Sequence, residues 1–181
     1  MGETLGFNIR PVASADAGAI AAIYAHYVEH SATTFELTPP GPAEILERMR
    51  HILPHHPFLV AERDGAVVGY AYAGKLYERA AYRWAAETTV YVAHGRQRQG
   101  IGQTLYAALI ATLAQQGFQT AIGKITLPNP GSVALHELFG FVRSGVLAKV
   151  GYKQGAWHDV GIYQLELGTR PTRPEETRPF V

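Results

Sequence analysis

The chain has 181 residues, of which 47% are hydrophobic and 17% charged. This length fits one domain, and a chain of this size buries about 70% of its unfolded surface without needing disulfides or a structural metal. Its 16 Lys and Arg against 15 Asp and Glu leave a formal net charge of +1, without the basic excess that nucleic-acid binding normally uses. Zero cysteines exclude disulfides, a thiolate nucleophile and thiolate metal sites.

The composition and the N-terminal residues predict no membrane partner and no nucleic-acid partner. Residues 1–10 hold no basic segment followed by an apolar one, and no apolar run approaches the roughly 18 residues of a membrane span. We therefore expect a soluble cytoplasmic protein. Eight histidines remain as candidate metal ligands, but His55-His56 lies between two prolines, where we expect a solvated turn. No metal site is predicted.

The first third of the chain predicts a strand, a helix, a loop and a second helix. Hydrophobic residues alternate with polar or small ones over residues 7–12, and the following helix, with Asp16 among its N-cap candidates, should end near residue 30. Residues 33–41 contain adjacent prolines, which cannot continue a helix. The next helix is expected to begin with Pro42, a favoured first-turn residue, and to stop at the next proline.

The middle third predicts a hairpin, a strand and the strongest helix. Two apolar runs, 58–61 and 67–72, flank an Asp-Gly dipeptide that favours a tight turn. Residues 87–92 have the pattern of another strand. From Ile101 leucines recur at helical spacing up to Gly117, a typical helix stop.

The last third predicts a strand, a short helix and two more strands. These elements are expected at 120–127, 130–139, 141–152 and 160–167. The order of elements along the chain predicts an α+β domain with a mixed, mostly antiparallel central sheet flanked by helices. We place a single domain at 1–167 and a tail without assigned secondary structure at 168–181, whose composition is compatible with disorder.

The glycine-containing loop Gln97–Gly102 joins a strand to the strongest helix. Glycines let a backbone approach a ligand closely, and the free N–H groups of a helix start attract anions. Arg98 adds a positive charge there. The loop matches neither GxxxxGK[ST] nor GxGxxG. On this pattern alone, a bare helix-initiating turn is an equal alternative.

Two motifs together indicate a family. Residues 129–141 resemble the Nxx[AS]xxL[YH]xxxG[FY] signature of the GNAT acetyltransferase superfamily, and QRQGIG at 97–102 resembles its [QR]xxGx[GA] acyl-CoA loop. Further segments resemble the phosphinothricin and methionine-sulfoximine N-acetyltransferases within it: 72–74, 81–84, 87–92, 127–129 and 155–161. The resemblance covers Ile9 to about Leu167. It implies the GNAT fold and an acetyl-CoA-dependent N-acetyltransferase.

By this resemblance Glu87 is the general base that removes a proton from the acceptor ammonium, a role that contributes roughly 10²- to 10⁴-fold. Apolar residues from Trp84 to Ala86 precede it and would favour withdrawing its carboxyl from water. A salt-bridged surface glutamate is the alternative. His136 occupies a position where many members carry a proton-donating tyrosine, and it suits a general acid or an auxiliary base. A core histidine is the alternative there.

The resemblance also assigns the acetyl-CoA site. The residues that it implies are Val90, Tyr91, Val92, Arg98, Gln99, Gly100, Ile101, Gly102, Gln103 and Asn129. Backbone N–H groups near residues 90–92 would stabilise the developing oxyanion. Asn129 is expected to bond the pantetheine, to cap its own helix, or both.

The acceptor is expected to be a small amino acid or analogue: phosphinothricin, methionine sulfoximine or methionine sulfone. Arg79 would pair with its carboxylate, and Phe35 and Tyr82 are candidate pocket walls, with core packing as the alternative for both. Arg83 departs from the acidic residue usual in the subfamily. The resemblance implies a homodimer. Two other functions stay open: acetylation of a protein N-terminus or polyamine, and a noncatalytic acyl-CoA-binding module.

Overall fold

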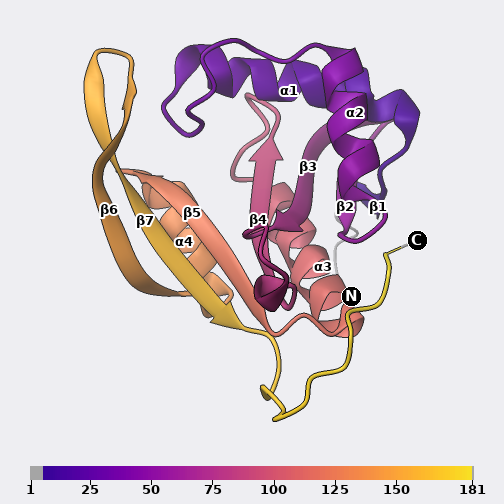
Figure 1. Cartoon of the computed structure of the whole chain (residues 1–181). Coiled ribbons are helices and arrows are strands. Elements are labelled where there is room, and N and C mark those ends of the chain that lie inside the picture. Colours follow the sequence, from indigo (N-terminus) through magenta and orange to yellow (C-terminus); the bar gives the residue numbers. More distant parts are fainter. Residues whose placement is uncertain (1–5, 181) are drawn as a thin grey trace.

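Seven strands form one open sheet in the computed structural model, which describes residues 6–180 (Figure 1). They are β1 (Asn8–Pro11), β2 (Phe58–Arg63), β3 (Ala66–Lys75), β4 (Ala85–Val92), β5 (Thr120–Leu127), β6 (Val142–Lys153) and β7 (Ala156–Glu166). Their order in the sheet is β1-β2-β3-β4-β5-β7-β6. All neighbours are antiparallel except β4 and β5, which are parallel. The predicted mixed, mostly antiparallel sheet is confirmed.

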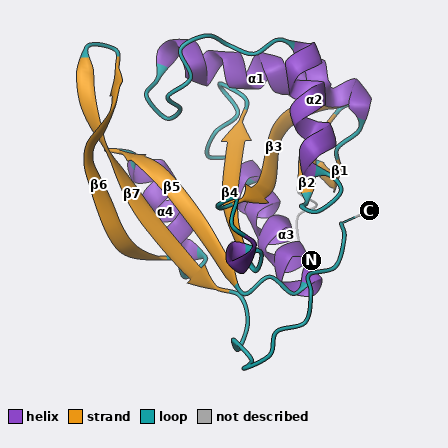
Figure 2. Ribbon diagram, in the orientation of Figure 1, coloured by secondary structure: helices purple, strands orange, loops and turns teal. Residues whose placement is uncertain are grey.

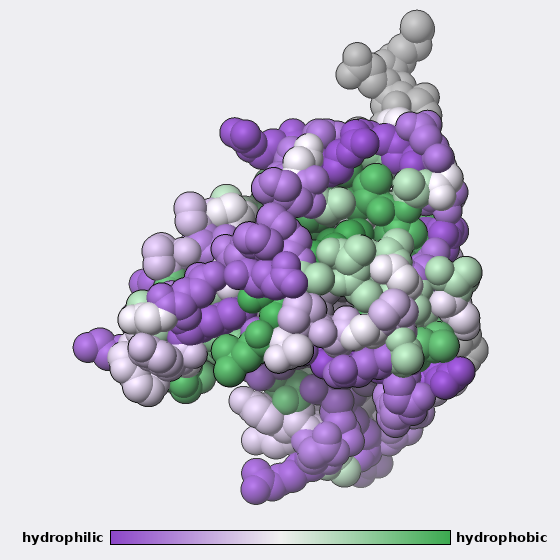
Figure 3. All heavy atoms as spheres, turned by 90° about the horizontal axis from the view of Figure 1, so that it is seen from above, coloured by the Kyte–Doolittle hydropathy of each residue, from purple (hydrophilic) through white to green (hydrophobic). Residues whose placement is uncertain are grey.

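Helices cover both faces of this sheet (Figure 2). The first pair, α1 (Ala17–His30) and α2 (Pro42–Ile52), packs on one face, and α3 (Ile101–Gln116) packs on the other. The short helix α4 (Pro130–Leu138) lies beside β5. Seen from above, hydrophobic residues form a patch bordered by hydrophilic ones (Figure 3). No helix within residues 6–180 combines the length and the apolar character that a membrane crossing needs.

Local sequence signals predicted most elements correctly. Asp64 and Gly65 form the expected turn between β2 and β3, with φ angles of 52° and 75° in the left-handed region. Gly117 has φ 93° and ends α3. The apolar run of α3 is fully buried at Leu105 and Leu109, where each leucine stabilises the fold by about 1.5–3 kcal/mol relative to an exposed side chain.

Two local expectations were correct only in part. Asp16 is the N-cap residue of α1, but its side chain does not cap this helix: its carboxylate accepts the Ala13 N–H and pairs with Arg10 at 2.7 Å. The turn at His55 and His56 is present and His55 is exposed, but His56 is half-buried, because its ring packs against Phe118 with 5.3 Å between ring centroids. This burial lowers the pKa of His56 to about 4.

The tail after β7 has no helix or strand over residues 168–180, and it packs against the domain. The Trp84 indole N–H donates to the Glu175 carbonyl at 2.7 Å, and Arg83 pairs with Glu176 at 2.8 Å. Further along, the Phe180 side chain contacts the core on the α3 side. The tail therefore spans from the segment before β4 to the α3 side of the core.

Candidate active site

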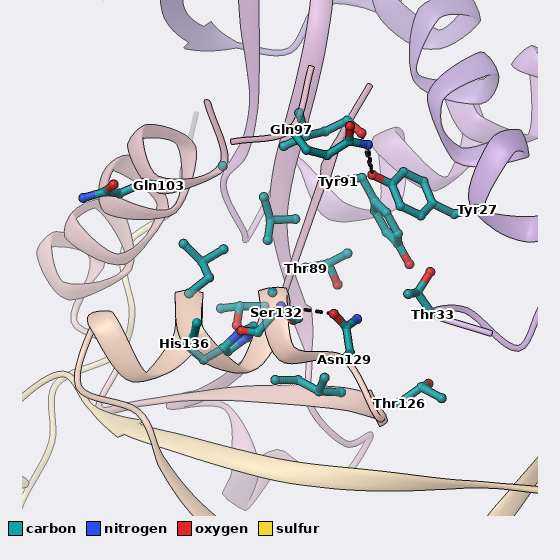
Figure 4. A pocket seen from close by; sticks show the side chains of 18 of the residues that line it. Tyr27, Thr33, Thr89, Tyr91, Gln97, Gln103, Thr126, Asn129, Ser132 and His136 are labelled. Carbon is teal, nitrogen blue, oxygen red and sulfur yellow. Dashed lines mark hydrogen bonds between the residues drawn. The ribbon is translucent and has the colours of Figure 1, made fainter. Parts of the chain in front are cut away.

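A cavity of about 720 Å³ opens where β4 and β5 separate. The two strands pair only over Ala85–Glu87 and Thr120–Ile122. Side chains of β4, of the loop after α1 and of the start of α4 surround the space beyond this point (Figure 4). At the point of separation Thr88 Oγ1 contacts the Tyr106 hydroxyl at 2.7 Å and donates to the Ile122 carbonyl at 3.2 Å. This buried contact joins β4, β5 and α3.

One end of the cavity is built to hold an anion. Gly100, with φ 79° in the left-handed region, is the residue that caps the start of α3. The first N–H groups of a helix have no intrahelical acceptors, and the helix dipole adds a partial positive charge. Arg96 and Arg98 line the cavity at the same end. Phosphate is a suitable ligand for such a helix start.

Most residues predicted for acetyl-CoA binding line this cavity. They are Val90, Tyr91, Val92, Arg98, Gly100, Gly102, Gln103 and Asn129. Gln99 and Ile101 do not. The Ile101 side chain is 1% exposed in the core, because the first turn of α3 packs against β3, and the Gln99 amide oxygen accepts from Arg63 at 2.7 Å. Asn129 does cap α4, since its side chain accepts the Ser132 N–H at 3.1 Å.

Glu87 lines the cavity and is paired with a lysine. Its Oε2 lies 2.6 Å from Nζ of Lys124, and both side chains are 32% exposed. The expectation that apolar neighbours would withdraw this carboxyl from water was wrong. Trp84 turns instead toward the tail, where Arg83 stacks on its ring at 4.1 Å. Glu87 is thus a paired, partly hydrated carboxylate.

His136 lies under β5 and is 4% exposed. Its Nδ1 is 2.8 Å from the Ser132 carbonyl, and because a carbonyl only accepts, Nδ1 carries the proton. Nε2 has no hydrogen-bond partner among the described residues and packs against Gly123 so closely that a Cβ there would collide with it. Burial lowers the pKa of His136. The ring is therefore neutral at pH 7, with one free acceptor nitrogen.

The three residues predicted for the acceptor lie outside the cavity lining. The Phe35 ring covers Gly151 of β6 and would collide with a Cβ there. Tyr82 packs edge-on against Tyr77 at 4.8 Å and borders a second cavity of about 260 Å³ beneath the tail. Arg79 begins the 3-10 turn Ala80–Tyr82. None of the three side chains lines the cavity with Glu87.

Sequence reasoning missed Lys124 and Tyr27, which both line the cavity. Lys124 carried a signal, since it is the sole charged residue in the apolar segment of β5. The Tyr27 hydroxyl donates to the Val92 carbonyl at 2.6 Å and lies 3.5 Å from the Gln97 amide nitrogen (Figure 4). Nothing in the local sequence of α1 indicates this contact. Residues 6–180 contain no cluster of three or more His, Asp or Glu side chains placed to hold a metal ion.

An open sheet that separates at its parallel pair, a helix start suited to an anion and a carboxylate on the same cavity are features expected of an acetyltransferase domain. Residues 9–162 match the family described as acetyltransferase (GNAT) domain. The chain belongs to this family, and the predicted GNAT fold and enzyme class are confirmed.

Three acetyltransferases are similar to this chain over most of its length. Phosphinothricin N-acetyltransferase of Streptomyces viridochromogenes is 44% identical over 171 residues, which are 92% of this chain and 93% of the relative. The L-methionine sulfoximine/L-methionine sulfone acetyltransferase of Salmonella typhimurium is 32% identical over 88% of this chain and 94% of its own. A crystal structure of a phosphinothricin acetyltransferase from Sinorhizobium meliloti in complex with AcCoA has a TM-score of 0.92 at 35% identity and covers 97% of both chains.

Proposed function

We propose that this protein transfers the acetyl group of acetyl-CoA to the amino group of a small amino acid or analogue, with phosphinothricin, methionine sulfoximine and methionine sulfone as the candidate acceptors. The observation that carries the proposal is the Glu87 carboxylate on the wall of a cavity whose other end suits a phosphate. The names of relatives that align over most of both chains support the choice of acceptors.

The residues of the cavity fit acetyl-CoA as the cosubstrate. The start of α3, with Arg96 and Arg98, would hold the pyrophosphate by backbone N–H groups and charge. The part of β4 beyond Glu87 has left its pairing with β5, so its free backbone groups suit the amides of the pantetheine arm. Asn129, which already caps α4 through its oxygen, lies beside that path.

In the proposed reaction Glu87 acts as the general base. Its carboxylate takes a proton from the acceptor ammonium, and the neutral amine attacks the thioester carbonyl. The new C–N bond forms as the C–S bond breaks, the nitrogen loses its second proton to become an amide, and the departing thiolate takes up one proton to become the thiol of CoA. Because the chain has no cysteine, a cysteinyl acyl-enzyme cannot form, and the proposal is direct transfer from acetyl-CoA to the amine. Backbone N–H groups of Val90 to Val92 are the proposed donors to the oxyanion.

His136 suits an accepting role better than a donating one. Burial lowers its pKa, which favours the neutral ring, and its unprotonated Nε2, which has no partner among the described residues, can only accept a hydrogen bond. We assign it as an auxiliary base or polarising group rather than the proton donor to the thiolate. Arg79, Tyr82 and Phe35 stay proposed acceptor residues, although none of the three lines the cavity.

A homodimer is part of the proposal. β6 is an edge strand of the sheet, and edge strands with exposed apolar side chains are prone to pairing with another chain. Exposed hydrophobic residues of β6 are Val142, Val146, Leu147, Val150 and Tyr152. A cytoplasmic location stays a prediction.

The test is release of free thiol from acetyl-CoA with the three acceptors, for the parent protein and for Glu87→Gln. The variant should bind acetyl-CoA as the parent does and lose about 10²- to 10⁴-fold in turnover. Glu47→Gln is the matched control, because Glu47 is also ion-paired but lies on the exposed face of α2. Parent protein that binds acetyl-CoA and acetylates none of the three acceptors would overturn the substrate assignment. Full turnover in Glu87→Gln would overturn the role of the base.

A further inference from the structure

Lys124 is placed in the cavity by the register of the parallel strands. Glu87 of β4 lies opposite Ile122 of β5, and side chains two residues apart on a strand share a face. Lys124 therefore projects on the same side as Glu87, at the point where the strands separate. Its Nζ is 2.6 Å from the Glu87 carboxylate and 5.5 Å from the centroid of the Tyr77 ring.

This contact conflicts with the proposed reaction unless the ion pair exchanges partners. The acceptor ammonium must reach the Glu87 carboxylate, which Lys124 already occupies. When the acceptor ammonium takes that place, two cations lie side by side and one carboxylate serves both. Like charges at contact distance repel, and the effect is stronger in a partly dehydrated site than in water. The displaced lysine then needs an anion of its own.

An α-amino acid carries that anion next to its amino group. Its carboxylate is one carbon away from the amine, so two neighbouring side chains of opposite charge can contact both groups at once. Glu87 would receive the ammonium and Lys124 the carboxylate. A simple amine or a polyamine offers no such anion and leaves Lys124 unpaired beside a second positive charge. Arg79, assigned to the carboxylate by sequence reasoning, does not line the cavity, whereas Lys124 does.

We propose that Lys124 is a specificity-determining residue, which selects acceptors that carry a carboxylate beside the amino group. This inference rests on the proposed function, since it concerns the acceptor of the same site. It requires that Lys124 contact the acceptor in addition to pairing with Glu87. The alternative is that Lys124 and Glu87 form only a partly exposed salt bridge, which contributes little to stability and nothing to the choice of acceptor.

The experiment compares two acceptors that differ only at the carboxylate: methionine sulfone and its carboxamide. The quantity is the ratio of kcat/KM for the acid to that for the amide, so that a general loss of folded protein cancels. The parent should prefer the acid. In Lys124→Met the ratio should fall at least tenfold, through a higher KM for the acid, whereas Lys124→Arg, which keeps the charge, should retain most of the preference.

Arg50→Met is the control, since it removes one positive charge from an exposed ion pair on α2 and should leave the ratio unchanged. A ratio unchanged in Lys124→Met, or an equal loss for both acceptors, overturns the selective role while the proposed function stands. A parent that acetylates neither acceptor refutes the proposed function itself, and with it the inference that rests on it.

Discussion

The half-buried ring of His56 should make the free energy of unfolding decrease in acid. The residue lies in the turn after α2, where its ring packs against Phe118 and burial lowers its pKa to about 4. In the unfolded chain a histidine titrates near pH 6.5. The unfolded state therefore binds a proton at a higher pH than the folded state does, and the free energy of unfolding decreases as the pH falls from about 6.5 to about 4.

The magnitude follows from these two pKa values. Going from pH 7 to pH 5 protonates nearly all of the unfolded His56 and little of the folded one, which costs about 2 kcal/mol of stability as an upper figure. The ring keeps some contact with solvent, so we expect about 1–2 kcal/mol. His56→Gln abolishes this titration, because glutamine stays neutral throughout.

The assay is urea unfolding at pH 7 and pH 5 for the parent, His56→Gln and His30→Gln. His30 is the control, since its side chain is 62% exposed. The His56 variant should lose about 1–2 kcal/mol less than the parent between the two pH values, and the His30 variant should match the parent. His136, whose pKa burial also lowers, contributes equally to all three proteins. An identical loss in His56→Gln would refute the assignment of the acid sensitivity to this ring.

Two further predictions concern the tail and β6. Removing residues 168–181 deletes the carbonyl that accepts the Trp84 N–H and the carboxylate that pairs with Arg83. The loss of about 1–2 kcal/mol in the free energy of unfolding should lower the unfolding temperature by roughly 2–8 °C and shift the tryptophan emission to the red. An unchanged unfolding temperature and emission would contradict a structural role for the tail. Leu147 and Val150 lie at exposed positions of β6. Substituting both by Asp should halve the molecular mass measured by light scattering and leave the far-UV CD spectrum unchanged. A parent protein that is already monomeric would refute the proposed dimer.

The elements could be predicted because their signals are local. An Asp-Gly pair suffices for the turn between β2 and β3, and Gly117 ends α3 through its own φ angle. The turn before α3 was also predictable, since the glycines of the loop directly precede the helix start in the chain. Ile101, predicted for acetyl-CoA binding, is instructive, because its side chain lies in the core instead of the cavity lining. Ile101 obeys the helical period of α3, and that period directs its side chain away from the cavity.

The acceptor side was less predictable because it depends on contacts between distant segments. Apolar surroundings for Glu87 were expected from its neighbours in sequence. The Trp84 side chain, however, donates its hydrogen bond to a carbonyl of the tail, 91 residues further on. Lys124 reaches Glu87 from 37 residues away through the strand register. Arg79 has the right chemistry for a carboxylate, yet the course of the segment between β3 and β4 keeps its side chain out of the lining. Residue type indicates chemistry, whereas register decides which groups meet.

The short parallel pairing explains why Glu87, Lys124 and the cavity proposed for the cosubstrate occur together. If β4 continued to pair with β5 up to Val92, the strand amides would be used within the sheet and no space for a ligand would remain. Because pairing stops at Glu87, the backbone beyond it needs other partners, and the Tyr27 hydroxyl supplies one for the Val92 carbonyl. The same stop leaves no β4 residue opposite Lys124 in the register, and its side chain pairs with Glu87, which lies opposite Ile122. The early end of the β4–β5 pairing thus leaves β4 backbone groups available for the proposed cosubstrate and also places Lys124 beside Glu87, in the ion pair that the proposed amino-acid acceptor would have to separate.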